Sequence, residues 1–230
     1  MTALNCYVTA DAAHLITDGA LYAADDGAIS AISSKVIHAP HLNCVFGYSG
    51  TMYAGEAARL VLIQFNPASF DDLAEKASQH FKDIAAMTAT LPNWPRSFDG
   101  VEIVLAGWSG RAAAPAAFLF RGGPHHGSPS WVAHQITRHQ MPLVDPVFKL
   151  DPADPAQSAR RLIDAQRIQK CHPTMSGSTH LEIYGVGGFA QHTEVMENQI
   201  STSVIRRWAD PVGKPINPFS EANGYRSAFQ

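Results

Sequence analysis

Strand-like and helix-like segments come in blocks along this chain, and their order is the strongest constraint on its fold. Several short segments rich in strand formers come first, followed by two amphipathic helices, more strands, one further helix and late strands. Blocks of strands joined as hairpins favour antiparallel sheets, whereas a parallel βαβ array requires strands and helices to alternate. We therefore expect antiparallel sheets with helices layered outside them.

The boundaries follow from periodicity, turn residues and caps. Apolar residues recur at helical spacing after residue 51, and Ser69 and Asp154 are suitable N-caps for two further helices. The expected helices cover 51–65, 69–87 and 155–170; the expected strands cover 3–9, 14–23, 101–108, 116–120, 131–136 and 180–186, the last with a partner around 194–200. Residues 1–210 are predicted to form a single domain, and residues 211–230 an extended C-terminal tail.

Composition excludes several classes of protein. The chain has 230 residues, of which 46% are hydrophobic and 16% charged, so it can bury a substantial core and disorder is not expected. The net charge is -3 without a basic stripe, which argues against a nucleic-acid partner. No apolar run reaches the roughly 18 residues of a spanning helix, so no membrane partner is expected. Three cysteines without CxxC spacing and no secretory signal predict reduced thiols in a cytoplasmic protein.

The start of the chain holds the most reactive combination of residues. If Met1 is removed, Thr2 carries both a hydroxyl and a free α-amine, and a terminal threonine of this kind can act as nucleophile with its own amine as base. Asp18 and Lys35 follow at spacings that neighbouring strands could bring beneath Thr2. Taken singly, the three residues are better explained as a strand start, an Asp-Gly turn and a surface lysine, and only their combination favours the catalytic interpretation.

The ordered set of motifs resembles the β-type subunits of the proteasome and the related bacterial HslV-type peptidases, within the N-terminal nucleophile (Ntn) hydrolases. The matching segments are Met1-Thr2, Thr17-Asp18-Gly19, Lys35-Val36, and residues 45–51, 101–108, 156–170, 176–178 and 181–184. The resemblance covers most of residues 2–190 in order. It implies an α+β fold with a four-layer αββα sandwich, threonine-dependent amide hydrolysis of a peptidase-like kind, and assembly into closed homo-oligomers, usually rings.

The resemblance also implies roles for individual residues. Thr2 would be the nucleophile, Lys35 would stabilise the developing alkoxide, and Asp18 would hold Lys35 by a charge-assisted hydrogen bond. Gly50 would offer its N–H group to the oxyanion, and Ser176 matches the late active-site serine of the family. Gly50 is equally well explained as part of a strand-to-helix turn.

Three further residues are candidates for contact with substrate. Gly47 would permit close approach of the substrate backbone. Tyr48 and Met52 would shape a specificity pocket beside Thr2, and core packing is the alternative for both side chains. The expected substrate is a peptide, and a hydrolase of small amides remains open.

One position departs from the family pattern. The family places an aspartate three residues before the late serine, and this chain has Pro173 there, whose side chain offers no hydrogen-bonding group. A second family serine has no convincing match. These losses leave a catalytically inactive scaffold or interaction subunit as the alternative function.

The histidines do not predict a metal site. The chain has 11 histidines, but neither His125-His126 nor the pair His38 and His41 comes with the spacing of a zinc site. Scattered polar histidines are the better account, so we expect no metal and no cofactor.

Overall fold

The computed structural model describes residues 2–23, 26–92, 98–123, 129–144, 148–172 and 182–220. Its helices are α1 (Tyr53–Phe65), α2 (Phe70–Thr88) and α3 (Pro155–Arg167), with a short 3-10 helix η1 (Pro40–Leu42). Its strands are β1 (Leu4–Val8), β2 (Ala13–Asp18), β3 (Ala20–Tyr22), β4 (Ile29–Ile32), β5 (Val36–Ala39), β6 (Cys44–Ser49), β7 (Glu102–Ser109), β8 (Ala114–Arg121), β9 (His134–Ile136), β10 (Arg138–Met141), β11 (Lys170–Cys171), β12 (Ile183–Tyr184), β13 (Phe189–Met196) and β14 (Gln199–Arg207).

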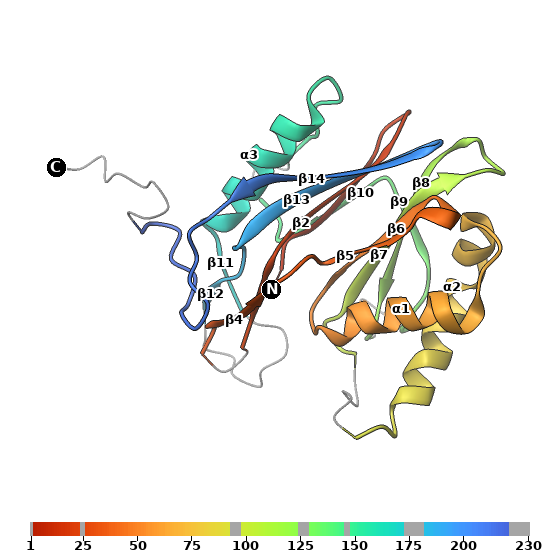
Figure 1. Cartoon of the computed structure of the whole chain (residues 1–230), viewed down its shortest axis with the longest axis horizontal. Coiled ribbons are helices and arrows are strands. Elements are labelled where there is room, and N and C mark those ends of the chain that lie inside the picture. Colours follow the sequence, from red (N-terminus) through yellow and green to blue (C-terminus); the bar gives the residue numbers. More distant parts are fainter. Residues whose placement is uncertain are drawn as a thin grey trace.

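Two five-stranded antiparallel sheets pack face to face and enclose one hydrophobic core (Figure 1). The strand order is β10-β1-β2-β13-β14 in one sheet and β5-β6-β7-β8-β9 in the other. Leu4 and Leu15 of the first sheet meet Val45 and Val104 of the second in this core. Strands alternate the faces of their side chains, so each sheet can bury a second set of apolar residues on its outer face.

Helices α1 and α2 cover the outer face of the β5-β6-β7-β8-β9 sheet (Figure 1). Ser69 caps α2 by accepting a hydrogen bond from Asp72 N at 3.1 Å, as its sequence position predicts. The apolar face of α2 then buries Phe81 against Phe46 of β6 and Phe120 of β8. This helical pair therefore anchors the strand end that carries residues 47–50.

Helix α3 lies on the outer face of the other sheet, over β2, β13 and β14 (Figure 1). Its N-cap Asp154 accepts from Gln157 N, and its Leu162 and Ile163 pack on Ile16. A reciprocal amide pair ties the helix to β1, because Asn5 and Gln166 donate to each other at 3.0 and 2.8 Å. A cavity opens at the N-terminal end of α3, between the helix and strands β1, β2, β10 and β13.

The predicted fold class is wrong. The expected four-layer αββα sandwich has two sheets, whereas the described chain is mostly β and has four antiparallel sheets, with its three α-helices on the outer faces of the two large ones. The expectation came from the family resemblance, and hairpin patterns cannot show that short strands pair apart from the main sheets. The two extra sheets are β3-β4 and β11-β12, of two strands each.

The late strands also pair differently from the prediction. The segment expected to form a strand over 180–186 contributes only β12, which pairs with β11 and not with residues 194–200. The long hairpin is β13-β14, and β13 completes the first sheet by pairing with β2. Within the described part of the chain, no helix combines the length and the apolar character needed to cross a membrane.

Candidate functional site

Three strand ends bring Thr2, Asp18 and Lys35 together. Thr2 precedes β1, Asp18 ends β2, and Lys35 precedes β5 of the facing sheet. Lys35 Nζ donates to Asp18 Oδ1 at 2.7 Å and to Thr2 Oγ1 at 3.0 Å. The exposed fractions of Thr2, Asp18 and Lys35 are 4%, 0% and 1%. The residues that the sequence grouped by spacing alone therefore form one buried, hydrogen-bonded cluster.

The Asp18 carboxylate is engaged by four donors. Besides Lys35, Ala3 N donates to Oδ1 at 3.0 Å, while Ala20 N and Gly187 N donate to Oδ2 at 3.2 and 3.0 Å. Three backbone N–H groups and one ammonium thus fix its orientation. Because its lone pairs are used for these contacts, Asp18 is suited to positioning Lys35 and the chain at Ala3, and not to accepting a proton from Thr2.

Burial governs the charge of Lys35. Loss of hydration lowers the pKa of its ammonium from the usual value of 10.5, and the charge and hydrogen bond of Asp18 oppose this shift. A protonated Lys35 donates to Thr2 Oγ1 and would stabilise negative charge that develops there. The same cation disfavours protonation of any amine beside it.

A second buried ion pair supports the loop that contacts Asp18, and sequence reasoning missed it. Arg167 binds Asp210 in a bidentate manner, with N–O distances of 2.9 and 2.7 Å. Arg167 also donates to Val186 O, and Asp210 accepts from Gly188 N. The pair therefore holds both sides of Gly187, whose N–H group reaches Asp18. Residues 43 positions apart in sequence gave no local signal of this contact.

The two predicted glycine sites differ in what surrounds them. A Cβ at Gly47 would lie 2.7 Å from Leu15 Cδ2 and 3.0 Å from Leu4 Cδ1, so this glycine makes room for core leucines of the facing sheet. Gly50 has φ of +94°, and a Cβ there would meet Gly100 O at 2.9 Å. The backbone therefore requires glycine at Gly50, whereas at Gly47 a larger residue would force the leucine side chains to move. The predicted roles of Gly47 in substrate approach and of Gly50 at an oxyanion stay predictions.

Tyr48 and Met52 lie in different surroundings. The Tyr48 ring packs against Gly55 in the first turn of α1 and joins the core on the helix-covered side of its sheet, which favours core packing for this residue. Met52 is the N-cap residue of α1, and 59% of it is exposed. Ser176 and Pro173 lie outside the described residues, so the predicted role of the serine stays a prediction.

Cys171 is a neighbour of the cluster that the sequence did not single out. Burial is the main cause that raises the pKa of its thiol, and the charge of Asp18 acts in the same direction. The thiol donates to Ile183 O at 3.5 Å. A neutral, buried thiol is a poor nucleophile, so Cys171 is a structural element of the cluster's surroundings.

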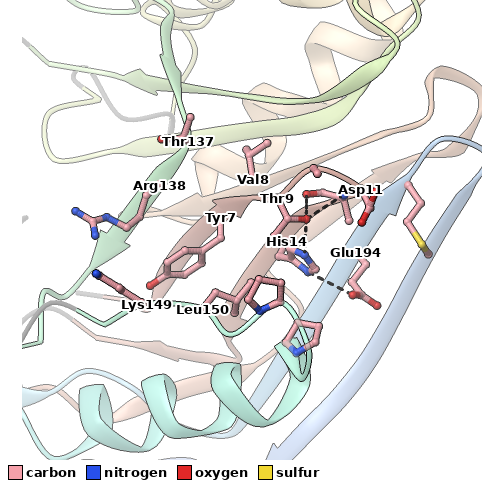
Figure 2. A pocket seen from close by; sticks show the side chains of 15 residues that line it. Tyr7, Val8, Thr9, Asp11, His14, Thr137, Arg138, Lys149, Leu150 and Glu194 are labelled. Carbon is pink, nitrogen blue, oxygen red and sulfur yellow. Dashed lines mark hydrogen bonds and ion pairs between the residues drawn. The ribbon is translucent and has the colours of Figure 1, made fainter.

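A cavity of about 800 Å³ opens elsewhere, on the outer face of the first sheet beside α3 (Figure 2). Tyr7, Thr9 and His14 line one wall, and Lys149 and Leu150 approach from the segment before α3. Thr2, Asp18 and Lys35 are not among the lining residues. The cavity is therefore a separate feature from the buried cluster at Thr2.

Comparison with solved structures finds a protein whose fold is similar to this arrangement. The similar structure is a Gly-1 mutant of Anbu from Hyphomicrobium sp. strain MC1. The match has a TM-score of 0.60 and 10% sequence identity, and it covers 90% of this chain and 88% of the Anbu chain. At this identity the similarity supports the fold alone.

The narrower resemblance inferred from the sequence is wrong. No family model and no curated protein matches the chain, and the similar solved structure is described as Anbu. The motifs behind the resemblance were short and spread over most of the chain. Each contains residues that any buried strand or strand-to-helix turn can carry, so their order could indicate a broad fold and not a subfamily.

Proposed function

We propose that the chain is an N-terminal threonine amidohydrolase that acts after removal of Met1. The observation that carries the proposal is the 3.0 Å hydrogen bond from Lys35 Nζ to Thr2 Oγ1, in a cluster where Asp18 holds the ammonium. A neutral threonine hydroxyl is a weak nucleophile. It needs a base to take its proton and a positive charge to stabilise the alkoxide that develops on its oxygen. The new α-amine supplies the base, and Lys35 supplies the fixed positive charge.

In the proposed reaction the α-amine of Thr2 carries the proton in both steps. The α-amine, with a reference pKa of about 8 against about 10.4 for lysine, accepts the hydroxyl proton as Thr2 Oγ1 attacks the amide carbonyl. The tetrahedral intermediate expels the amine, which takes this proton, and leaves an ester on Thr2. Water, activated by the same α-amine, then hydrolyses the ester and releases a carboxylic acid. Lys35 stays protonated and Asp18 stays its positioning partner throughout.

The alternative is a catalytically inactive subunit. Pro173 in place of the family aspartate favours it, and so does the exposed fraction of only 4% at Thr2. We keep peptides as the first substrate class and small amides as the second, and we propose a homo-oligomeric assembly. Sedimentation of the purified chain tests the assembly independently of activity.

Two substitutions at Thr2 test the proposed chemistry. Thr2→Val keeps the shape of the side chain and removes the hydroxyl, so hydrolysis of peptide amides and of small amides should fall to background. Thr2→Ser keeps a hydroxyl beside an α-amine and should retain measurable turnover. Lys76→Ala, at a lysine that is mostly exposed on α2, serves as control and should leave activity unchanged.

Probe labelling separates the proposal from the inactive alternative. An epoxyketone that requires both the hydroxyl and the free amine of a terminal threonine should label the wild-type chain once and the Thr2→Val variant not at all. Turnover that persists in Thr2→Val, or a processed wild-type chain that neither turns over nor labels, would overturn the proposal.

A further inference from the structure

A second polar cluster is built across two neighbouring strands of the first sheet. His192 and Glu194 alternate with Thr193 on β13, so their side chains lie on the same face. In the antiparallel register Glu194 lies opposite His14 of β2, and His192 lies opposite Ile16. Ile16 packs under α3, which identifies this face as the outer one. Two imidazoles and one carboxylate thus converge on the outer face of the sheet.

The distances between the three side chains fit the corners of a metal coordination sphere. His14 Nδ1 lies 3.2 Å from His192 Nε2 and 3.3 Å from Glu194 Oε1. Ligands at about 2.1 Å from a tetrahedral metal are about 3.4 Å apart, so both separations match one edge of such a tetrahedron. All three ligand atoms lie within 4.8 Å of one another. The Glu194 side chain is 29% exposed, so it can rotate to bring its carboxylate closer to the His192 nitrogen.

Thr9 sets the orientation and the tautomer of His14. Its hydroxyl donates to Ala12 O at 3.1 Å and accepts from Ala12 N at 3.2 Å. His14 Nε2 lies 3.4 Å from Thr9 Oγ1, whose own proton goes to Ala12 O, so this contact favours the tautomer in which Nε2 carries the proton. In that tautomer the lone pair of His14 Nδ1 is directed at His192 and Glu194. A metal-binding histidine characteristically donates its other ring N–H to a partner of this kind.

Without a bound cation, this tautomer of His14 brings two acceptors together. The His14 Nδ1 lone pair then faces the Glu194 carboxylate at 3.3 Å. A divalent cation among the three groups would convert this repulsion into attraction.

The cluster is also reachable from solvent. His14 and Glu194 both line the cavity of about 800 Å³, and Figure 2 shows their side chains pointing toward one another at its wall, beside Thr9. An ion held by the three side chains would keep one coordination position on the cavity side. His14 and Asp18 are four residues apart on β2, or roughly 13 Å at about 3.3 Å per residue, so this site is distinct from the cluster at Thr2.

We propose that His14, His192 and Glu194 form a binding site for one divalent transition-metal ion, of which Zn²⁺ fits best. Two imidazole nitrogens and one carboxylate oxygen are the ligand set of tetrahedral zinc with an open fourth position. A water molecule or a small anion fills that position from the cavity. Thr9 is the positioning residue that presents Nδ1 of His14 to the ion.

Direct metal titration of the full chain tests the proposal. After treatment with a chelator and dialysis, the wild-type chain should bind one equivalent of Zn²⁺ by calorimetry. With Co²⁺ it should develop visible d–d bands of a tetrahedral site without a thiolate charge-transfer band, because Cys6, Cys44 and Cys171 are buried and belong to none of the three ligand positions. Thr9→Val should weaken binding by about 10–100-fold, the usual effect of losing an outer hydrogen bond.

Ligand variants and one control complete the experiment. His192→Gln and Glu194→Gln preserve side-chain size and should each abolish the Co²⁺ spectrum, and the partial exposure of Glu194 makes its variant the safer one for folding. His41→Ala removes an exposed histidine outside the cluster and should bind like the wild type. Absence of saturable binding in the wild type, or unchanged Co²⁺ spectra in a folded Glu194→Gln chain, would overturn the proposal.

Discussion

At one end of β2, Asp18 meets an ammonium and three N–H groups; near the other end, His14 meets a second imidazole and a carboxylate. The first cluster joins an anion to donors only, and its four contacts lie between 2.7 and 3.2 Å. The second joins groups that can all accept. Buried polar groups are stable when donors and acceptors balance. The chain therefore satisfies the first cluster with its own groups, whereas a ligand from outside would stabilise the second.

The largest expected effect comes from removing the anion of the first cluster. Asp18→Ala leaves the buried Lys35 without its partner and three N–H groups without an acceptor, so the free energy of unfolding should fall by about 3–5 kcal/mol. Denaturant unfolding measures this change. Glu56→Ala breaks the exposed pair with Arg59 and should change stability by less than about 1 kcal/mol. Equal losses of unfolding free energy in Asp18→Ala and Glu56→Ala would contradict the view that Asp18 completes a balanced buried cluster.

The second cluster should respond to metal, and the first should not. At a free Zn²⁺ concentration of about 100 times Kd, the free energy of unfolding of the wild type should rise by about 2.7 kcal/mol. Thr2→Val should show the same gain and Glu194→Gln none, as read from denaturant midpoints with and without Zn²⁺. A gain that survives in Glu194→Gln would place the metal elsewhere on the chain.

A smaller effect tests the loop that links Asp18 to the buried Arg167–Asp210 pair. A Cβ at Gly187 would lie 2.7 Å from Asp210 Oδ2 and 2.7 Å from Ile216 Cδ1. Gly187→Ala should therefore lower the free energy of unfolding by about 1–3 kcal/mol through overpacking. Gly110→Ala is the matched control, because the nearest atom to its Cβ, Asp71 Oδ2, is 3.8 Å away. A neutral Gly187→Ala would mean that the loop does not hold Asp18 rigidly.

The smallest effect concerns the pH dependence of Lys35. Burial lowers the pKa of Lys35 in the folded chain below the 10.5 of the unfolded chain. Between the folded-state pKa and 10.5, the unfolded chain keeps a proton that the folded chain has released. Stability then rises with pH in this window, by at most about 1.4 kcal/mol per pH unit for one group. The stability difference between the wild type and Lys35→Met should therefore grow in favour of the wild type as the pH rises toward 10.5. A constant difference would contradict the lowered pKa.

Local chemistry explains which parts of the fold were predictable. Capping residues indicate where a helix begins, because they contact a residue only three positions further on. The two predicted caps make these contacts, Ser69 with Asp72 and Asp154 with Gln157. Pairing between distant strands has no such local signal. The pairing of β12 with β11, and of β13 with β2, joins segments whose order in the sequence does not indicate the partner, so the predicted number of sheets is wrong.

The two polar clusters also differ in how far the sequence predicts them. Thr2 and Asp18 lie at one end of the β1-β2 hairpin, and Lys35 follows within the first 35 residues, so chemical reasoning on residue types could group them. His14 and His192 are 178 positions apart, and their meeting depends on the register between β2 and β13. The short pattern His192-Thr193-Glu194 was the available signal, because alternate residues of a strand share a face.

The central claim is that the chain matures to expose an α-amine beside the Thr2 hydroxyl and that this pair is reactive. Intact-mass spectrometry of the native protein, before and after incubation with the epoxyketone, tests it most directly. We predict a chain that lacks Met1 and gains one probe adduct, with the adduct mapped to Thr2. Retention of Met1 in essentially all molecules, or a chain that starts at Thr2 and gains no adduct, would contradict the account.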